Sequence, residues 1–366
     1  MTVPETILEA SALRREFVTK RPLFGAPTLV RAVDGVDLKI HRGETFSIVG
    51  ESGCGKSTLA RLLVRLIEPT EGAVRYAGRN IADIPEAEMR RLRRDLQFIF
   101  QDPFSSLNPR MTVGALLEEP MQVHGLGSGT KRKAQVAKLL ARVGLPSDSA
   151  DRYPHEFSGG QRQRIGIARA LASGPKVLIG DEPVSALDVS IQAQVLNILE
   201  DLKAEFGLTL IVIAHDLAVV RHMSDRVAVM YLGEIVETAA VETLFSAPQH
   251  PYTAALIAAI LVPKVGVRRA HTALQGDPPN PIDLPSGCRF HPRCPHATEI
   301  CRTTRPVLSP RSGGGAVACH HADTLHLKGL ENAEAGLSAK AAARMELYRA
   351  ARARADGGGA AATTPQ

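Results

Sequence analysis

The chain has 366 residues, of which 44% are hydrophobic, and a formal net charge of +6. It contains no uninterrupted apolar run of about 18 residues, so we expect no membrane-spanning helix, and its first residues lack the pattern of a secretion signal, which predicts a protein of the cytoplasm. The basic clusters at 90–94 and 131–133 could meet anionic lipid or nucleic acid. A solvated face is the more common role of such clusters, and no interleaved aromatic residues favour nucleic acid.

The first motif in chain order is a glycine loop between a strand and a helix. Up to about residue 43 we expect edge strands and loops, with a half-exposed strand at 33–40, and then a buried apolar strand at 45–49 and a helix at 59–67. The loop between strand and helix has the form G-x-x-x-x-G-K-[ST] and consists of Gly50, Glu51, Ser52, Gly53, Cys54, Gly55, Lys56, Ser57 and Thr58. Its backbone N–H groups can cradle phosphates, Lys56 can reach the β- and γ-phosphates, and Ser57 can ligate Mg²⁺. The sequence therefore predicts a nucleoside triphosphate site.

The middle of the chain predicts a helical insertion into an α/β domain. A hairpin at 71–78, a helix at 85–94 and a strand at 96–100 lead to a turn-rich loop at 101–110. Residues 111–153 have helical periodicity that breaks at 125–129 and 144–146. A helix at 162–172 follows the motif Ser158, Gly159, Gly160, Gln161, whose serine lies near the N-cap position.

Three more apolar strands are predicted at 176–181, 208–214 and 226–231, with a helix at 190–206 that ends at Gly207. Alternating strands and helices favour a mostly parallel sheet, with ligands at the carboxyl ends of its strands. We expect the strand at 226–231 to close the sheet. Residues from about 262 to 330 are rich in Pro, Gly, Cys and His, which predicts a separate small module, followed by a helix at 333–353 and a disordered tail at 357–366.

Asp181 and Glu182 end the strand at 176–181. An acidic pair at a strand end is often only a turn or a helix cap. After a phosphate-binding loop, however, we expect Asp181 to hold Mg²⁺, through water, and Glu182 to orient or deprotonate the attacking water. We treat Cys54 as a small residue of the loop, although a thiol there could make the protein sensitive to alkylation.

Taken together, these motifs resemble those of ATP-binding cassette (ABC) ATPases over about residues 10–250. The motif at 158–161 is similar to the signature motif of that family, with Phe157 where leucine is usual. The resemblance implies that Gln101 links Mg²⁺ and water to the helical insertion and that His215 contacts the γ-phosphate. It identifies residues 185–188, which end at Asp188, as the D-loop, and Phe17 as an aromatic that stacks on adenine, unless Phe17 is only a core or edge residue.

The resemblance also implies a fold and an assembly. The expected fold is α/β, a P-loop NTPase with a RecA-like core and mostly parallel sheet, an antiparallel β subdomain and a helical subdomain at about 103–172. Two cassettes pair head to tail in this family, and each signature loop closes over the ATP of the partner. We therefore expect ATP binding to close the pair and hydrolysis to reopen it.

Four cysteines gather in the C-terminal region with the spacing C-x5-C-x6-C-x17-C, namely Cys288, Cys294, Cys301 and Cys319. In a reducing compartment such a group points to a metal. The close C-x2–4-C pairs of zinc fingers are absent, whereas four thiolates can hold a four-iron four-sulfur (4Fe-4S) cluster. Zinc and free thiols remain open, because neighbouring histidines could serve as zinc ligands, namely His291, His296, His320 and His321.

The loop at 101–110 and segments between 250 and 319 resemble the ATP-binding subunits of oligopeptide and dipeptide importers, some of which carry such a cluster. This implies an ATPase domain at 1–252, a C-terminal domain of that importer family at 253–330 and a helix with a tail at 331–366. The implied protein hydrolyses ATP at the cytoplasmic face of the membrane, as a peripheral subunit, to drive uptake of peptides.

The implied partners are two transmembrane permease subunits docked near residues 101–110, a second, related ATPase subunit and an extracytoplasmic solute-binding protein, with no nucleic acid. Nickel, glutathione and sugar-derived solutes remain open as cargo. A second hypothesis is a soluble ABC ATPase that acts on RNA, ribosomes or DNA. Such proteins usually carry two cassettes in one chain or a coiled-coil insertion, and neither is visible here.

Overall fold

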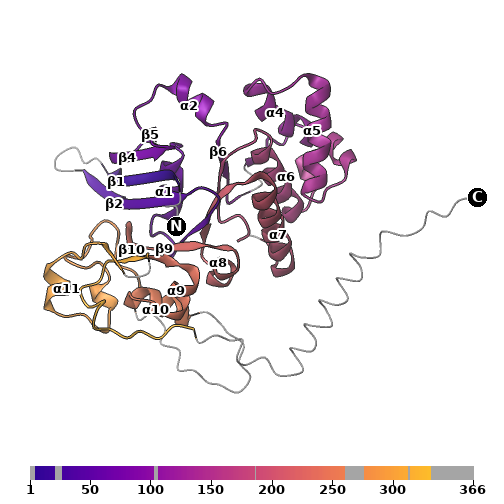
Figure 1. Cartoon of the computed structure of the whole chain (residues 1–366). Coiled ribbons are helices and arrows are strands. Elements are labelled where there is room, and N and C mark those ends of the chain that lie inside the picture. The colour runs from indigo at the N-terminus through magenta and orange to yellow at the C-terminus, as the bar shows by residue number, and fades with distance from the viewer. Residues whose placement is uncertain are drawn as a thin grey trace, which may run out of the picture.

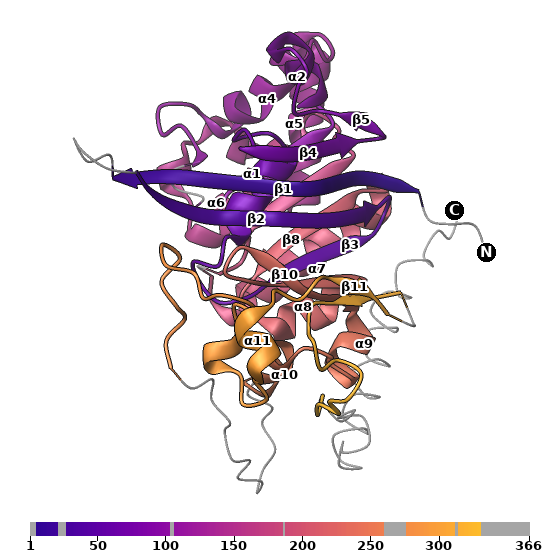
Figure 2. The ribbon, with the colours of Figure 1, turned by 90° about the vertical axis from the view of Figure 1, so that its left-hand side faces the viewer.

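The computed structural model describes residues 5–20, 27–102, 106–185, 187–259, 276–311 and 314–330. The helix predicted at 333–353 and the tail predicted at 357–366 lie outside these residues. Two sheets, a group of helices and a C-terminal segment make up the described chain (Figures 1 and 2). No helix in these ranges is long and apolar enough to cross a membrane.

The larger sheet has the strand order β11-β12-β10-β9-β3-β8-β7-β6 in the described chain. Its parallel part runs from β9 to β6. These strands are β3 (Thr45–Val49), β6 (Leu96–Ile99), β7 (Val177–Asp181), β8 (Thr209–Ala214) and β9 (Arg226–Tyr231). Because β3, β7 and β8 are buried at every position, their sequences are continuous apolar runs rather than alternating ones.

Successive residues of the parallel strands enter two different hydrophobic cores. In β8, Leu210 and Val212 face one core, whereas Ile211 and Ile213 face the other. The first core includes residues of α6 (Gly159–Leu171), α7 (Val189–Phe206) and α8 (Leu217–Met223). The second includes residues of α1 (Lys56–Leu63), α2 (Glu86–Leu92) and the smaller sheet. The parallel sheet is therefore covered on both faces.

The smaller sheet is antiparallel, with the order β2-β1-β4-β5. It consists of β1 (Thr6–Lys20), β2 (Thr28–His41), β4 (Glu71–Tyr76) and β5 (Arg79–Asn80). In Figure 1 it lies on the opposite side of the molecule from the helical subdomain. That subdomain contains α4 (Val113–Val123), α5 (Gly129–Arg142), η1 (Ser147–Asp151) and η2 (Pro154–Glu156). The predicted breaks at 125–129 and 144–146 are confirmed at the ends of α4 and α5.

The C-terminal segment corrects one prediction. The strand at 226–231 does not close the sheet, because β10 (Glu234–Ala240) pairs with β9, and β12 (Ala316–Val317) pairs with β10. Strand β11 (Ser309–Pro310) then adds to β12. These two strands belong to the segment predicted to be a separate Cys-rich module, and they extend the ATPase sheet instead of forming a sheet of their own. A segment with few apolar residues cannot bury a core of its own, but the open edge of β10 offers backbone partners.

The remaining elements hold this segment in place. Helices α9 (Val241–Ser246) and α10 (Pro251–Ala258) follow β10, and η3 (His291–Arg293) and α11 (Glu299–Thr303) lie beside them (Figure 2). Arg289 is only 7% exposed and forms ion pairs with Asp34 of β2 and, at 2.6 Å, with Glu234 of β10. The predicted boundary near residue 252 falls inside α10.

Candidate nucleotide-binding site

The loop between β3 and α1 has a backbone that only glycine allows at two positions. Gly50 has a φ of 153° and Gly55 a φ of 105°. A Cβ at Gly50 would lie 2.1 Å from the carbonyl oxygen of Met230, and one at Gly55 would lie 2.0 Å from that of Ala32. The loop therefore passes directly against β2 and β9, which fixes it at the carboxyl end of β3.

Lys56 lies inside this loop. Its side chain is buried, and Nζ donates hydrogen bonds of 2.9 Å to the carbonyl oxygens of Gly50 and Glu51. Helix α1 begins at Lys56, so its N-terminal N–H groups open onto the same space. A helix N-terminus and an enclosed ammonium group together favour an anion such as a phosphate.

The residues predicted to bind Mg²⁺ are adjacent. The hydroxyl of Ser57 donates a 2.7 Å hydrogen bond to Oδ1 of Asp181. The other carboxylate oxygen, Oδ2, is buried and accepts no hydrogen bond from the described residues, although Nη2 of Arg61 lies 3.8 Å away as an ion-pair partner. Burial raises the pKa of Asp181, and the hydrogen bond from Ser57 acts against that rise. A hydroxyl beside an unsatisfied carboxylate oxygen fits the preference of Mg²⁺ for oxygen ligands.

Two side chains from the ends of neighbouring strands meet at Glu182, which follows β7. Gln101, which follows β6, donates a 2.9 Å hydrogen bond from Nε2 to Oε2 of Glu182. Nδ1 of His215, which follows β8, lies 3.6 Å from the same oxygen. Glu182 has a φ of 48°, a left-handed conformation that is strained for a glutamate and that concentrates at functional sites. The fold thus gathers the three residues predicted to be catalytic around one carboxylate.

The D-loop adjoins this group. Ser185 donates a 3.2 Å hydrogen bond from its hydroxyl to the carbonyl oxygen of Glu182. A small cavity of about 30 Å³ is lined by Glu182, Ser185 and His215, among others. Asp188 is exposed and precedes α7 as its N-cap residue.

The signature motif and Phe17 lie apart from the loop. Ser158 caps α6, since its hydroxyl accepts the N–H of Gln161 at 3.4 Å while Oε1 of Gln161 accepts the N–H of Ser158 at 3.0 Å. Ser158 is exposed at the N-terminus of α6. Phe17 is half-buried on β1, outside both cores, and the guanidinium of Arg15 lies 4.7 Å from its ring centroid. Contacts of either residue with ATP stay a prediction.

Two residues that sequence analysis did not assign to the site contact the P-loop. The hydroxyl of Tyr252 accepts the N–H of Glu51 at 2.8 Å, and the guanidinium of Arg293 pairs with the Glu51 carboxylate. Arg293 is 242 residues away from Glu51 along the chain. No local pattern signals such a contact.

The four cysteines line one small cavity of about 10 Å³, together with histidines that include His250 and His321. Burial, reinforced by the other three thiols, raises the pKa of Cys288 to about 12. Among the described residues, no group of three or more His, Cys, Asp or Glu side chains could hold a metal ion. The structure therefore gathers the thiols but does not support the predicted iron–sulfur or zinc site.

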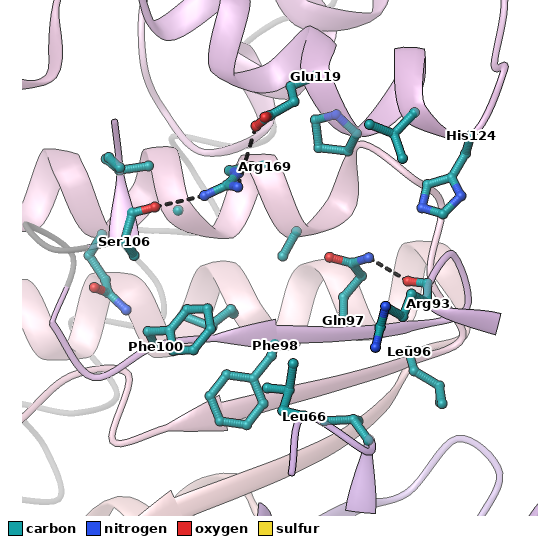
Figure 3. Close-up of a pocket in the computed structure, with 18 residues that line it drawn as sticks. Leu66, Arg93, Leu96, Gln97, Phe98, Phe100, Ser106, Glu119, His124 and Arg169 are labelled. Atoms are coloured by element: carbon teal, nitrogen blue, oxygen red, sulfur yellow. Dashed lines mark hydrogen bonds and ion pairs between the residues drawn. The ribbon is translucent and has the colours of Figure 1, made fainter. Parts of the chain in front are cut away.

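A larger groove of about 350 Å³ separates β6 from the helical subdomain (Figure 3). Apolar side chains, including Leu66 and Phe100, form one wall of the groove, and both are more than 40% exposed. On the other wall, Arg169 of α6 donates 2.7 Å and 3.4 Å hydrogen bonds to the carbonyl oxygen of Ser106 and to Glu119. The groove thus has one exposed apolar wall, and the opposite wall carries charged groups held by hydrogen bonds.

The chain is similar to known transporter subunits in two regions and over most of its length. A family model described as "ABC transporter" matches residues 33–185, and one described as "Oligopeptide/dipeptide transporter, C-terminal region" matches residues 236–301. The oligopeptide transport ATP-binding protein AppF of Bacillus subtilis is 49% identical over 320 residues, which cover 86% of this chain and 97% of that protein. The dipeptide transport ATP-binding protein DppF of Haemophilus influenzae is 48% identical over 318 residues, covering 87% and 97%.

A solved structure is also similar. The ATP-binding cassette MJ0796, in a dimeric post-hydrolysis state bound to ADP and Pi, shares 31% sequence identity with this chain at a TM-score of 0.58. The match covers 64% of this chain and 99% of that cassette. The remainder of this chain has no counterpart in that match.

Proposed function

The chain belongs to the ATP-binding subunits of ABC transporters, within the oligopeptide/dipeptide group, and we propose that it hydrolyses ATP to drive import of peptides or related small solutes. The observation that carries this proposal is the meeting of Gln101 and His215 at the carboxylate of Glu182, beside the P-loop and Asp181. Peptides are named from the relatives, and nickel, glutathione and sugar-derived solutes remain alternatives. A soluble ABC ATPase outside transport is the less favoured candidate.

Each side chain then has a distinct task. Lys56 and the N-terminus of α1 bind the phosphates, and Ser57 with Asp181 would hold Mg²⁺, which when bound neutralises phosphate charge. Glu182 orients the attacking water and accepts its proton. The amide of Gln101 fixes Oε2 of Glu182, and His215 stands close enough to the same oxygen to bind the γ-phosphate beside it. Because Gln101 leads into the helical subdomain, a change at this carboxylate can reach that subdomain.

The signature motif supplies the second half of a site in a dimer. Ser158 is the exposed N-cap residue of α6. A helix N-terminus favours an anion, and here the phosphates of ATP bound to another subunit would be that anion. The similar cassette MJ0796 is dimeric. We propose a head-to-tail pair with a second, related ATPase subunit, in which Ser158 of one chain contacts the ATP bound by the other.

The groove of Figure 3 is the proposed docking site for two transmembrane permease subunits. Its exposed apolar wall opposite Arg169 suits an amphipathic segment of a partner, and its position beside Gln101 links that partner to the ATP site. The protein would thus work as a peripheral subunit at the cytoplasmic face of the membrane, with an extracytoplasmic binding protein delivering the solute.

An iron–sulfur cluster remains a separate proposal for the four cysteines. It is supported by the four cysteines lining one cavity and by the affinity of thiolates for iron, and it requires their side chains to rearrange, because no group of described side chains could hold a metal ion as it stands. The raised pKa of Cys288 means that a thiolate there needs a cation to form near neutral pH. No mechanistic step of the ATPase requires the cluster.

The proposed function is tested with Glu182→Gln, which keeps the hydrogen-bond geometry and removes the base. The purified variant should bind ATP but hydrolyse it about 10²- to 10⁴-fold more slowly, and uptake of a labelled peptide by cells that depend on this subunit should stop. Glu242→Gln is the matched control, because Glu242 is an exposed residue of α9. If Glu182→Gln hydrolyses ATP at the wild-type rate, Glu182 is not the base. If the cells take up another solute through this subunit but no peptide, the assignment of peptides as cargo is refuted.

A further inference from the structure

The second residue of the P-loop, Glu51, is held by the C-terminal part of the chain. Nη1 of Arg293 lies 2.7 Å from Oε2 of Glu51, and Nη2 lies 3.0 Å from Oε1. This is a two-pronged contact in which both carboxylate oxygens are engaged by one planar guanidinium, the geometry that fixes a carboxylate most firmly. The hydroxyl of Tyr252 in addition accepts the backbone N–H of Glu51 at 2.8 Å.

These contacts are sheltered from water and rigid. The side chain of Arg293 is 5% exposed and that of Glu51 is 24% exposed, so the ion pair is screened much less than a surface pair. Tyr252 packs against Tyr231 and Phe290, with ring centroids 4.6 Å and 5.3 Å away. The aromatic block joins β9, α10 and the turn before η3, and it leaves Arg293 and Tyr252 little freedom to move.

Glu51 is also the residue whose carbonyl oxygen accepts a hydrogen bond from Nζ of Lys56. Its N–H is taken by Tyr252, its carboxylate by Arg293 and its carbonyl by Lys56, so every polar group of Glu51 has a fixed partner. A rotation of this residue would carry the carbonyl oxygen away and move the ammonium group with it. Nζ of Lys56 also donates to the carbonyl oxygen of Gly50, so one of its two 2.9 Å hydrogen bonds depends on side chains that lie outside the P-loop.

We propose that Arg293 and Tyr252 are positioning residues for the P-loop, so that the C-terminal segment is a working part of the ATP site and not only an attachment to it. Neither side chain needs to touch the nucleotide. They hold the backbone of Glu51, and through it Lys56, in the conformation that binds phosphate. The inference rests on ATP binding at the P-loop and is independent of which solute is imported.

The test measures the dissociation constant of a non-hydrolysable ATP analogue for the purified full-length chain, together with its melting temperature. Arg293→Ala should weaken binding about tenfold or more, since small displacements of binding groups have effects of that size. Arg293→Lys should recover part of the loss, because one prong remains. Tyr252→Phe keeps the ring and removes only the acceptor for the Glu51 N–H, so it should weaken binding with little change in melting temperature.

The matched control is Arg305→Ala. Arg305 belongs to the same segment and also forms ion pairs with the core, to Asp34 and Glu234, but it does not contact the P-loop. Its loss should leave ATP affinity unchanged. The double variant Arg293→Ala/Glu51→Gln should bind ATP no more weakly than Arg293→Ala alone, because both substitutions remove the same Arg293–Glu51 interaction.

The proposal is overturned if Arg293→Ala and Tyr252→Phe lower the melting temperature while ATP affinity stays at the wild-type value. It is overturned equally if Arg305→Ala weakens ATP binding as much as Arg293→Ala. Should Arg293→Ala fail to fold, Arg293→Lys and Tyr252→Phe decide the matter by the same two measurements. If the wild-type protein binds ATP but supports no peptide uptake, that result counts against the transport assignment and not against this inference.

Discussion

Replacing Arg289 by methionine should destabilise the protein strongly, because Arg289 joins the C-terminal segment to the ATPase core through buried charges. Its side chain is 7% exposed, that of Asp34 8% and that of Glu234 13%. Methionine keeps most of the apolar stem and removes the charge. Without Arg289, Asp34 keeps Arg14 and Arg305 as partners, and Glu234 keeps only the exposed Arg305. Removing the sole partner of a buried charge costs about 3–5 kcal/mol, so we expect the free energy of unfolding to fall by about 3 kcal/mol, the lower end of that range.

The loss should depend on pH. Burial raises the pKa of Glu234, and the charge of Arg289 acts against that rise. A carboxyl group with a raised pKa binds its proton more readily in the folded than in the unfolded chain, so its contribution to stability falls as pH increases through that pKa. Without Arg289 the pKa of Glu234 rises further. The deficit of Arg289→Met should therefore be largest near neutral pH and should shrink as the pH falls toward the carboxyl range.

The assay is urea unfolding followed by far-ultraviolet circular dichroism at several pH values, with Arg305→Met as the comparison. Arg305 pairs with the same two carboxylates, but its side chain is 45% exposed, so its removal should cost only about 0–1 kcal/mol. Equal losses for the two variants would contradict the argument from burial. A deficit of Arg289→Met that stays constant with pH would contradict the role given to Glu234.

Further substitutions test other parts of the site. Gly55→Ala should abolish ATP binding, because its Cβ would lie 2.0 Å from a backbone oxygen. Gly53→Ala, whose Cβ would have no atom within 4 Å, should show only the strain of its positive φ, about 1 kcal/mol. Equal ATP affinities of the two variants would contradict the steric argument. Ser158→Arg should keep ATP affinity and lose hydrolysis and ATP-dependent dimerisation, measured by gel filtration; a variant that still hydrolyses ATP would refute the shared site. Anaerobically purified protein should contain iron and absorb visible light, and Cys294→Ser should lose both; a colourless, iron-free wild type would refute the cluster.

Local pattern was enough to locate most of the elements and the P-loop. The strand at 45–49 agrees residue for residue with β3, because a short, mostly apolar and β-branched stretch that runs into a glycine loop is typical of a fully buried parallel strand. The helix after the loop begins at Lys56, three residues before the predicted start at 59. Its first three residues belong to the phosphate-binding motif, which we assigned to the loop and not to the helix.

The C-terminal segment marks where local pattern fails. Strands β11 and β12 are two residues long each, too short to show any periodicity, and their pairing with β10 depends on an edge formed elsewhere. The four cysteines suggested a self-contained metal module, yet three arginines tie that region to the ATPase core, two with buried side chains and one exposed, namely Arg289, Arg293 and Arg305. Nothing in the spacing of these arginines distinguishes them from surface charges.

The sequence alone determined that this protein binds a nucleoside triphosphate, because the loop from Gly50 to Thr58 carries its chemistry in consecutive residues. The order of the later motifs also determined the family. Only the tertiary structure decided that Gln101, Glu182 and His215 meet at one carboxylate oxygen and that Arg293 holds Glu51. These contacts join the ends of separate strands and residues far apart in the chain, and the packing of the sheet, not any local preference, brings them together.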